Sequence, residues 1–436
     1  MPSGPKASTL EAWLEYIEGL HPQAVVMGLD RVAAVRDALG LAPSFTGITV
    51  GGTNGKGSAC AMLEAILRHA GYEVGCYTSP HLMRYNERVR VDRREATDTD
   101  LVHAFHAIES ARGATPLTYF EFGTLAAVWL FVQRQVDVAI LEVGLGGRLD
   151  AVNAFDPACA LVMSVDLDHM DYLGTTREEI GFEKAGIFRP GQPAICSSVP
   201  APLSLVRHAV RIGARLLLRD QDFGYGADRN QWQYWGPGGK RHGLPYPALR
   251  GSSQLANAAA CIAALDALRD RLPVTMGDIR AGLLQAENPG RFQVLPGRPA
   301  VILDVAHNPQ AAQALAESLL RMGPHGRTIA VFSMLRDKDI RGVIDAVKAS
   351  VDCWCIAPVA TPRAAPAELI ERHLRDAIVA PLVIRCAHVA AAYAHACGMA
   401  TEDDKILVFG SFYTVAAVMR ARAARNSAHG GRSDAG

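Results

Sequence analysis

The chain of 436 residues contains 44 Lys and Arg against 44 Asp and Glu, so its formal net charge is zero. Hydrophobic residues make up 49% and charged residues 20%, a composition typical of a folded globular protein with two or three domains. A balanced charge argues against a nucleic-acid coat or a membrane-surface protein, since both usually need a basic excess. No apolar run reaches the roughly 18–20 residues of a membrane-spanning helix.

The cysteines and the start of the chain predict the cellular compartment. Nine cysteines are scattered between Cys60 and Cys397 without zinc-finger spacing, and we expect them to be reduced thiols. The first residues lack the basic flank and apolar stretch of a secretory signal. We therefore expect a cytoplasmic protein, acting as a monomer on small molecules, with no nucleic-acid or membrane partner.

Short apolar runs rich in Val and Ile alternate with helical patterns in the first part of the chain, which is typical of parallel α/β architecture. The predicted strands are 45–50, 74–78, 136–143, 160–165 and 193–196. Helices are expected at 58–70 and 254–268. Residues 220–247 mix Gly, Pro, Trp and Tyr with polar residues, which predicts irregular or antiparallel structure at the edge of the first domain.

A second α/β pattern follows a segment rich in proline and glycine, residues 287–299, which is predicted to be a linker. We place the domain boundary near residue 296, giving domains of 1–296 and 297–436. The predicted strands of the second domain are 300–305, 328–332, 354–357 and 405–409. The tail after Met419 shows little periodicity beyond a first helical turn or two and is expected to fray.

A glycine-rich turn follows the first predicted strand. The segment Gly51-Gly52-Thr53-Asn54-Gly55-Lys56-Gly57-Ser58 leads directly into a helix, a geometry that presents backbone N–H groups to phosphate. Lys56 could reach the outer phosphates. The strict Walker pattern fails, because Val50 replaces its first glycine and Gly57 separates Lys56 from Ser58. A tight turn with an exposed lysine is the alternative, but the context favours ATP binding.

The same loop resembles that of the Mur ligase superfamily, which joins carboxylates to amines using ATP. The additional Gly57 is similar to the folylpolyglutamate synthase and dihydrofolate synthase branch of that superfamily. The resemblance extends from about Leu14 to Met419. Further segments resemble motifs of that branch in the same order: 78–82, 86–90, 142–150, 183–187, 289–292, 304–309 and 410–412.

Two groups of residues are candidates for binding metal ions. Glu142 ends a predicted buried strand beside the phosphate loop and is well placed to hold Mg²⁺, with an ion-paired acid as the alternative. His169 is chemically better suited to hydrogen bonding, because Mg²⁺ prefers oxygen ligands. The resemblance implies instead that Ser79, Glu142 and His169 surround Mg²⁺. It also implies that a carbamylated Lys184 holds a second metal ion.

The resemblance also assigns nucleotide and glutamate contacts. Arg291 follows a Pro-Gly turn and could clamp the γ-phosphate when the domains close. His307 and Ser411 lie in motifs near which the family places the incoming glutamate. The implied ATP contacts are Thr53, Asn54, Gly55, Lys56, Gly57, Ser58, Asn257, Arg291 and Asp304. The implied catalytic residues are Lys56, Lys184, Arg291 and His307.

An aromatic pair beside a carboxylate suits a flat heterocycle with hydrogen-bonding edges. Tyr119, Phe120 and Glu121 form such a group, although the two aromatic residues fit equally well as ordinary core. The pterin contacts implied by the resemblance are Val25, Val26, Met27, Gly28, Thr118, Tyr119, Phe120, Glu121, Leu149, Asp150 and Ala151.

The resemblance implies a P-loop parallel-sheet α/β domain followed by a smaller Rossmann-like α/β domain, with the active site in the cleft between them. The expected enzyme uses ATP and Mg²⁺ to join L-glutamate to dihydropteroate and to add γ-linked glutamates to reduced folates through an acyl phosphate. Alternatives are folylpolyglutamate synthesis alone, a peptidoglycan Mur ligase, and a non-catalytic nucleotide switch. The switch does not explain the second-domain segment 304–308.

Overall fold

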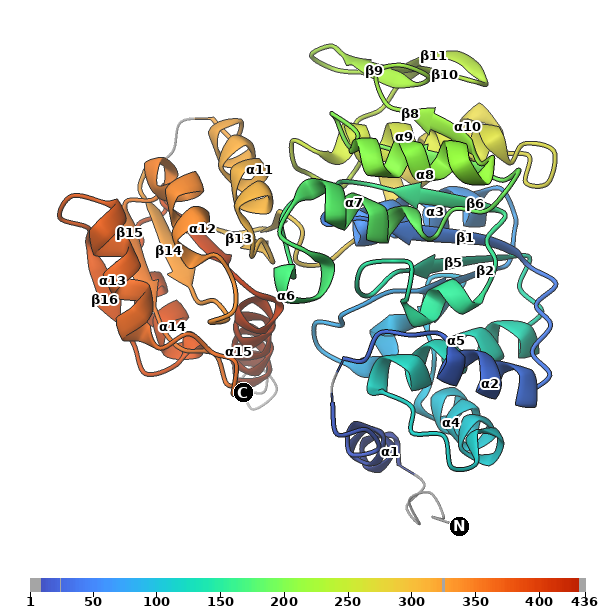
Figure 1. The fold of residues 1–436 in the computed structure, drawn as a ribbon. Coiled ribbons are helices and arrows are strands. Elements are labelled where there is room, and N and C mark those ends of the chain that lie inside the picture. Colours follow the sequence, from blue (N-terminus) through green and yellow to red (C-terminus); the bar gives the residue numbers. More distant parts are fainter. Residues whose placement is uncertain (1–8, 24, 324–325, 431–436) are drawn as a thin grey trace. The chain divides into compact units, whose positions relative to one another are not determined.

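The computed structural model describes residues 9–23, 25–323 and 326–430. The chain divides into two compact units, each with its own parallel sheet (Figure 1). The first unit comprises Met1–Ala248 and Gln254–Glu287, and the second comprises Leu249–Ser253 and Asn288–Gly436. The division lies before the boundary expected near residue 296, because the strand that precedes residue 296 pairs within the second unit.

The first unit is built on an eight-stranded sheet in the order β4-β3-β2-β5-β1-β6-β7-β8. Its strands are β1 (Thr46–Gly51), β2 (Val74–Tyr77), β3 (Val89–Val91), β4 (Arg94–Glu95), β5 (Val138–Glu142), β6 (Cys159–Val162), β7 (Pro193–Cys196) and β8 (Arg215–Leu218). All neighbours from β2 to β8 are parallel, whereas β3 and β4 add antiparallel strands at one edge. Strand β1 therefore lies inside the sheet, and Val50 is in register with Glu142.

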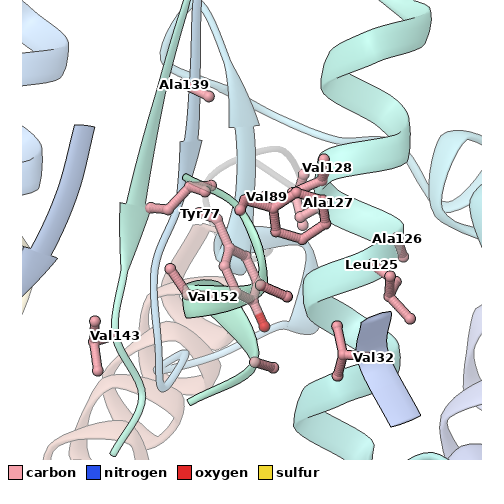
Figure 2. Packing of buried hydrophobic residues seen from close by; sticks show 14 of the residues in the cluster. Val32, Tyr77, Val89, Leu125, Ala126, Ala127, Val128, Ala139, Val143 and Val152 are labelled. Carbon is pink, nitrogen blue, oxygen red and sulfur yellow. The ribbon is translucent and has the colours of Figure 1, made fainter. Parts of the chain in front are cut away.

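The helices of this unit pack against the sheet and against one another. They are α1 (Leu10–Glu18), α2 (Asp30–Ala38), α3 (Lys56–His69), α4 (Asp98–Arg112), α5 (Tyr119–Gln133), α6 (Met170–Leu173), α7 (Arg177–Ala185), α8 (Leu203–Ile212), α9 (Gln254–Ala267) and α10 (Met276–Gln285). The short 3₁₀ helices are η1 (Tyr85–Arg88) and η2 (Ala151–Ala154). Tyr77 of β2, Val128 of α5 and Val152 of η2 belong to one buried cluster (Figure 2).

Helix α3 carries the residues that follow the phosphate loop and is buried along most of its length. It packs against α9 and α10, and it also contacts β1, β2 and β5. A helix that is buried on several sides holds its N-terminus firmly, and this N-terminus is where the phosphate loop ends. The packing of α9 and α10 therefore supports the position of the loop.

The segment 220–247 forms the predicted antiparallel structure. It contains the three-stranded sheet of β9 (Gly224–Ala227), β10 (Trp232–Gly236) and β11 (Gly239–Leu244). Buried Asp266 of α9 accepts hydrogen bonds from Tyr234 Oη at 2.9 Å and from Gly238 N at 3.1 Å. Arg241 also donates to this carboxylate, at 3.0 Å. These bonds attach the small sheet to α9.

The second unit contains a six-stranded sheet in the order β12-β13-β17-β14-β15-β16. Its strands are β12 (Gln293–Leu295), β13 (Ala300–Asp304), β14 (Thr328–Phe332), β15 (Cys353–Ile356), β16 (Val383–Arg385) and β17 (Lys405–Phe409). Its helices are α11 (Pro309–Leu320), α12 (Ile340–Val347), η3 (Lys348–Ser350), α13 (Ala367–Ala377), α14 (Val389–Met399) and α15 (Phe412–Gly430). All neighbouring pairs are parallel except β12 with β13.

Two sequence-based expectations for this unit are wrong. The predicted linker contains strand β12, because its backbone pairs with β13 through the register Val294↔Ile302. The chain after Met419 does not fray within the described residues but continues as α15 to Gly430. The Arg422 guanidinium donates to Tyr393 Oη at 2.7 Å, which attaches α15 to α14. Among the described residues, no helix combines the length and the apolar character needed to cross a membrane.

The two glycines of α10 provide a test of the packing beneath the phosphate loop. A Cβ atom on Gly282 would lie 2.5 Å from Ile66 Cα of α3, whereas on exposed Gly277 its nearest neighbour, Thr275 Oγ1, would be 3.4 Å away. We expect Gly282→Ala to destabilise the protein by about 1–3 kcal/mol through overpacking, whereas Gly277→Ala leaves stability unchanged or slightly raised. Urea unfolding measures both, and equal stability of the two variants would contradict this packing.

Candidate active site

The phosphate loop needs glycine at two positions. Gly52 and Gly55 have φ angles of 139° and 89°, a region that L side chains rarely adopt. A Cβ atom on Gly52 would lie 3.0 Å from Met163 N, and one on Gly55 would lie 2.7 Å from Asn257 Oδ1. The loop backbone therefore runs against the chain after β6 and against α9, which places Asn257 beside the predicted ATP-binding residues.

The loop is also fixed by hydrogen bonds to the segment after β6. Thr53 N donates to Ser164 O at 2.7 Å, and Asn54 N donates to Ser164 Oγ at 2.9 Å. The Thr53 hydroxyl donates to Asp166 O at 3.1 Å and accepts from Asp166 N at the same distance. Ser164 and Asp166 therefore hold the predicted ATP-binding loop in place.

Lys56, the first residue of α3, points its amine back over the loop. Its Nζ donates to Gly52 O at 3.0 Å and to Thr53 O at 3.2 Å. A cation held over a turn that is rich in backbone N–H groups is a suitable partner for phosphate oxygens. Thr53, Asn54, Gly55, Lys56, Gly57 and Ser58 lie between the end of β1 and the first turn of α3, as predicted, and their contact with ATP stays a prediction.

Helix α9 supplies a second layer behind the loop. Gln254 Nε2 donates to the buried Ser58 Oγ at 3.4 Å, and Asn257 Nδ2 donates to Gln254 Oε1 at 3.1 Å. Gln254 was not predicted from the sequence, because its partner Ser58 lies 196 residues away along the chain. The first turn of α9 thus connects Asn257 with the loop.

The structure brings together two of the three predicted magnesium ligands. Glu142 ends β5, is 3% exposed, and accepts a hydrogen bond from Ser79 N to its Oε2 at 3.0 Å. A buried carboxylate and a nearby hydroxyl are oxygen donors of the kind that Mg²⁺ prefers. Their chemistry therefore fits the ion.

His169 lies on a different segment, as the residue that precedes α6, with φ 52° and an exposed side chain. Its Nε2 lies 4.0 Å from Asp168 Oδ1. No group of three or more His, Cys, Asp and Glu side chains within residues 9–23, 25–323 and 326–430 is arranged to hold a metal ion. Coordination by His169 therefore stays a prediction.

Lys184 is buried near the end of α7, where it is 4% exposed. Burial is the main cause that lowers the pKa of its amine to about 7; the positive charge of Lys56 acts in the same direction, while Asp168 and Asp150 oppose the shift. An amine with this pKa is substantially neutral at physiological pH. A neutral amine is the nucleophilic form of lysine.

Asp150 is the buried acid of the 145–152 turn. Its carboxylate accepts from Leu145 N at 2.8 Å and from Val152 N at 3.0 Å. Burial raises its pKa to about 7, although these backbone hydrogen bonds and the charge of Lys56 act in the opposite direction. Asp150 thus shapes the turn that contains Leu149 and Ala151, two other predicted pterin contacts.

The three predicted pterin segments lie together in the first unit. Gly28 N donates to Leu149 O at 3.3 Å, which links the first segment to the third. The Phe120 ring lies close to Gly144, since a Cβ atom there would be 2.6 Å from Phe120 Cζ. Phe120 also contacts the Tyr77 ring at 5.8 Å between centroids. The structure thus gathers residues that are more than 100 positions apart in the sequence.

Glu121 is held by an arginine that the sequence did not indicate. The Arg31 guanidinium donates to Glu121 Oε1 at 2.7 Å and to Val26 O at 3.1 Å. Thr118 N donates to Glu121 Oε2 at 2.7 Å, completing the capping box of α5. Arg31 therefore joins the 25–28 segment, which includes Val25 and Met27, to the start of α5. The sequence does not indicate this pairing, because Arg31 and Glu121 are 90 positions apart in the chain.

The predicted site residues of the second unit gather at the carboxyl ends of β13 and β17. The Arg291 guanidinium lies 5.4 Å from the centroid of the Phe412 ring, and the His307 ring lies 6.4 Å from the same ring. Asp304 accepts from Phe292 N at 2.8 Å and from Ala306 N at 2.7 Å. Burial raises the pKa of Asp304, whereas the charge of Arg291 opposes the rise.

Ser411 belongs to the same edge of this sheet but is buried. Thr414 N donates to Ser411 Oγ at 3.1 Å, and the two hydroxyl oxygens lie 2.7 Å apart. The Thr414 hydroxyl donates to Ser333 O at 2.9 Å, so it must accept from Ser411. The Ser411 hydroxyl therefore donates its hydrogen to Thr414 at the start of α15.

The buried amine of Lys184 makes stability depend on pH. Its pKa falls from 10.5 in the unfolded chain to about 7 in the folded protein. Between these two values the unfolded chain binds a proton that the folded protein does not, so stability decreases as pH falls through this range. The variant Lys184→Met has no titratable amine at this position, so its stability does not decrease for this reason as pH falls.

We therefore expect the stability of Lys184→Met relative to wild type to rise on going from pH 10 to pH 7, by up to a few kcal/mol. Urea unfolding in bicarbonate-free buffer measures the difference. Lys240→Met, at an exposed position of β11, is the matched control and should show no such trend. A difference that does not change with pH would contradict a neutral Lys184.

Both units match known protein families. Residues 50–198 match the Mur ligase middle domain, and residues 290–412 match the Mur ligase glutamate ligase domain. The chain is 46% identical to the dihydrofolate synthase/folylpolyglutamate synthase of Escherichia coli (strain K12), over 97% of each chain. It is 33% identical to the folylpolyglutamate synthase of Lacticaseibacillus casei, over 85% of this chain and 88% of that protein.

Solved structures agree with these sequence matches. The E. coli FolC complex with DHPP and ADP has 45% identity and a TM-score of 0.92, covering 98% of this chain and 100% of that chain. A bifunctional folylpolyglutamate synthase/dihydrofolate synthase from Yersinia pestis, complexed with AMPPNP and Mn ion, has 44% identity and a TM-score of 0.88, covering 97% and 100%. The chain therefore belongs to the dihydrofolate synthase/folylpolyglutamate synthase family of the Mur ligases.

Proposed function

We propose that this protein is an ATP-dependent ligase that joins L-glutamate to dihydropteroate and adds γ-linked glutamates to reduced folates. The observation that carries the proposal is the glycine-rich loop that ends at Lys56 beside a strand that ends in buried Glu142. The chain that contains this loop also matches a bifunctional synthase over 97% of its length. The bound molecules named for the related structures, DHPP, ADP and AMPPNP, support the same chemistry.

The reaction needs activation of a carboxylate. An amine cannot displace oxide from a carboxylate at neutral pH, so the γ-phosphoryl group of ATP is first transferred to a carboxylate oxygen. The glutamate amine then attacks the acyl phosphate, and phosphate leaves as the amide forms. Positioning and neutralisation of charge supply most of the catalysis in such transfers, and no covalent enzyme nucleophile is required.

We assign the phosphate contacts to the loop and the amine of Lys56, which already lies over the turn. Ser79, Glu142 and His169 are proposed to hold Mg²⁺, which neutralises the charge of the phosphate oxygens when it is bound. Asn257 is proposed to contact the nucleotide as well. In the second unit, Arg291 and Asp304 are proposed as further nucleotide contacts, and His307 and Ser411 as contacts of the incoming glutamate.

Lys184 is proposed to be carbamylated. Its pKa of about 7 leaves enough neutral amine to attack carbon dioxide, and loss of one proton from nitrogen then gives a carbamate. The change converts a buried amine into an anion, which could hold a second metal ion. The nearby Lys56 would stabilise such an anion, since its positive charge already acts on Lys184.

The pterin substrate is proposed to contact the three gathered segments 25–28, 118–121 and 149–151. The link between Gly28 and Leu149 and the bonds of Arg31 to Val26 and Glu121 support this choice, because they make one surface of the three segments. We further propose that the protein acts as a monomer in the cytoplasm. Folylpolyglutamate synthesis alone is the narrower alternative, as in the name of the L. casei relative.

Phosphate release tests the activity. We expect release to require ATP, Mg²⁺, L-glutamate and either dihydropteroate or tetrahydrofolate. With dihydropteroate labelled with ¹⁸O in its carboxylate, we expect one labelled oxygen in the released phosphate, because that oxygen bridges carbon and phosphorus in the acyl phosphate. Amide product with unlabelled phosphate would rule out this route, and turnover with tetrahydrofolate only would favour the narrower alternative.

The role of Glu142 has its own test. We expect Glu142→Gln to raise the Mg²⁺ concentration for half-maximal activity on the order of tenfold or more, because a carboxylate ligand of a hard cation is lost. Glu73→Gln, an exposed acid before β2, is the control and should titrate like wild type. A magnesium titration of Glu142→Gln that superimposes on wild type would make Glu142 a purely structural residue.

A further inference from the structure

The inference concerns Arg88, a residue without a role in the site described so far. Arg88 is the last residue of η1, and its side chain is partly exposed. Its guanidinium carbon lies 5.5 Å from the ring centroids of both Tyr85 and Tyr119. Two aromatic rings therefore fix the plane of this guanidinium beside the start of α5, where Thr118, Phe120 and Glu121 lie.

The one hydrogen-bond partner of the Arg88 side chain within the described residues is neutral. Arg88 Nε donates to His81 Nδ1 at 2.9 Å. Since a guanidinium only donates, Nδ1 must be the accepting nitrogen and the ring proton must be on Nε2. His81 thus orients the guanidinium and leaves its positive charge in place.

Three other arginines of this unit, by contrast, have their charge neutralised by an acidic partner. Arg31, Arg90 and Arg112 are each paired with a carboxylate, those of Glu121, Glu64 and Glu109.

Within the part of the chain that the structure describes, Arg88 has no carboxylate within 4.0 Å. Its sequence neighbour Glu87 instead accepts from the backbone N–H groups of Leu82, Met83 and Arg84, at 2.7 to 2.8 Å. The two terminal nitrogens of Arg88 therefore remain available as a fork that matches a carboxylate.

We propose that Arg88 binds a carboxylate of the folate substrate that does not react. This rests on the proposed function. Tetrahydrofolate carries two carboxylates on its glutamate: the γ-carboxylate is activated, and the α-carboxylate keeps its charge throughout the reaction. A group with a permanent negative charge needs a permanent positive partner, which the guanidinium of Arg88 supplies.

The position of Arg88 agrees with this assignment. The α-carboxylate lies between the reacting γ-carbon and the pteridine ring, so its partner should lie beside aromatic residues of the pterin segments, as Arg88 does beside Tyr119. Dihydropteroate has a single carboxylate, the one that reacts, so it gains nothing from this site. Arg88 should therefore distinguish the two substrates.

Steady-state kinetics with dihydropteroate and with tetrahydrofolate, each at saturating ATP and glutamate, test the proposal. We expect Arg88→Gln to lower kcat/KM for tetrahydrofolate by on the order of tenfold or more, with a change within about twofold for dihydropteroate. Arg88→Lys keeps the charge without the fork and should lie between wild type and Arg88→Gln. Arg84→Gln, an exposed arginine beside the same 3₁₀ helix, is the matched control.

Equilibrium dialysis of tetrahydrofolate against each variant adds a readout that does not depend on turnover, and we expect a weaker affinity for Arg88→Gln. Equal losses for both substrates, or no loss for tetrahydrofolate, would overturn the proposal. If a thermal melt shows that Arg88→Gln is unfolded, Arg88→Lys decides, because it retains the charge beside the tyrosine rings. Absence of glutamate-dependent turnover in wild type would instead reject the proposed function itself.

Discussion

The close approach of the phosphate-loop backbone to its surroundings is the constraint on which the first unit depends. Gly52 lies against Met163, and Gly55 lies against Asn257, so neither position has room for a side chain. The loop can be that close only because β1 lies between β5 and β6, and α3 lies against α9 and α10. Packing of the whole unit thus determines where the backbone N–H groups of the loop point.

The charges around this loop follow from the same arrangement. Lys56, Lys184, Asp150 and Asp168 act on one another electrostatically because these segments converge near the carboxyl ends of the central strands. The pKa of Lys184 is lowered to about 7, and the pKa of Asp150 is raised to about 7. Burial is the main cause of both shifts, so the protonation of these two groups depends on the packing around the loop as well as on its charges.

Much of the fold could be predicted from local patterns. The strands at Pro193–Cys196, Thr328–Phe332 and Lys405–Phe409 have the predicted bounds, because buried parallel strands are largely continuous hydrophobic segments that the sequence reveals. Strand β12 was missed because its proline- and glycine-rich flanks indicate a linker, and its pairing with β13 is tertiary. The glycines and Lys56 of the candidate site were recognisable for the same local reason. Arg31 was not, since its importance comes from Glu121, 90 residues away.

The short excursion Leu249–Ser253 affects how the first unit is completed. Ser252 N donates to Ser318 Oγ at 3.1 Å within the second unit, after which the chain returns to form α9 and α10. A fragment that ends at Ala248 would therefore lack both helices and expose the apolar side of α3. During synthesis, the nucleotide-binding unit stays incomplete until the ribosome has passed Gln285. The first unit can therefore complete its packing only after α10 has been made, and cleavage within Leu249–Ser253 would leave it as two chain segments held together by packing alone.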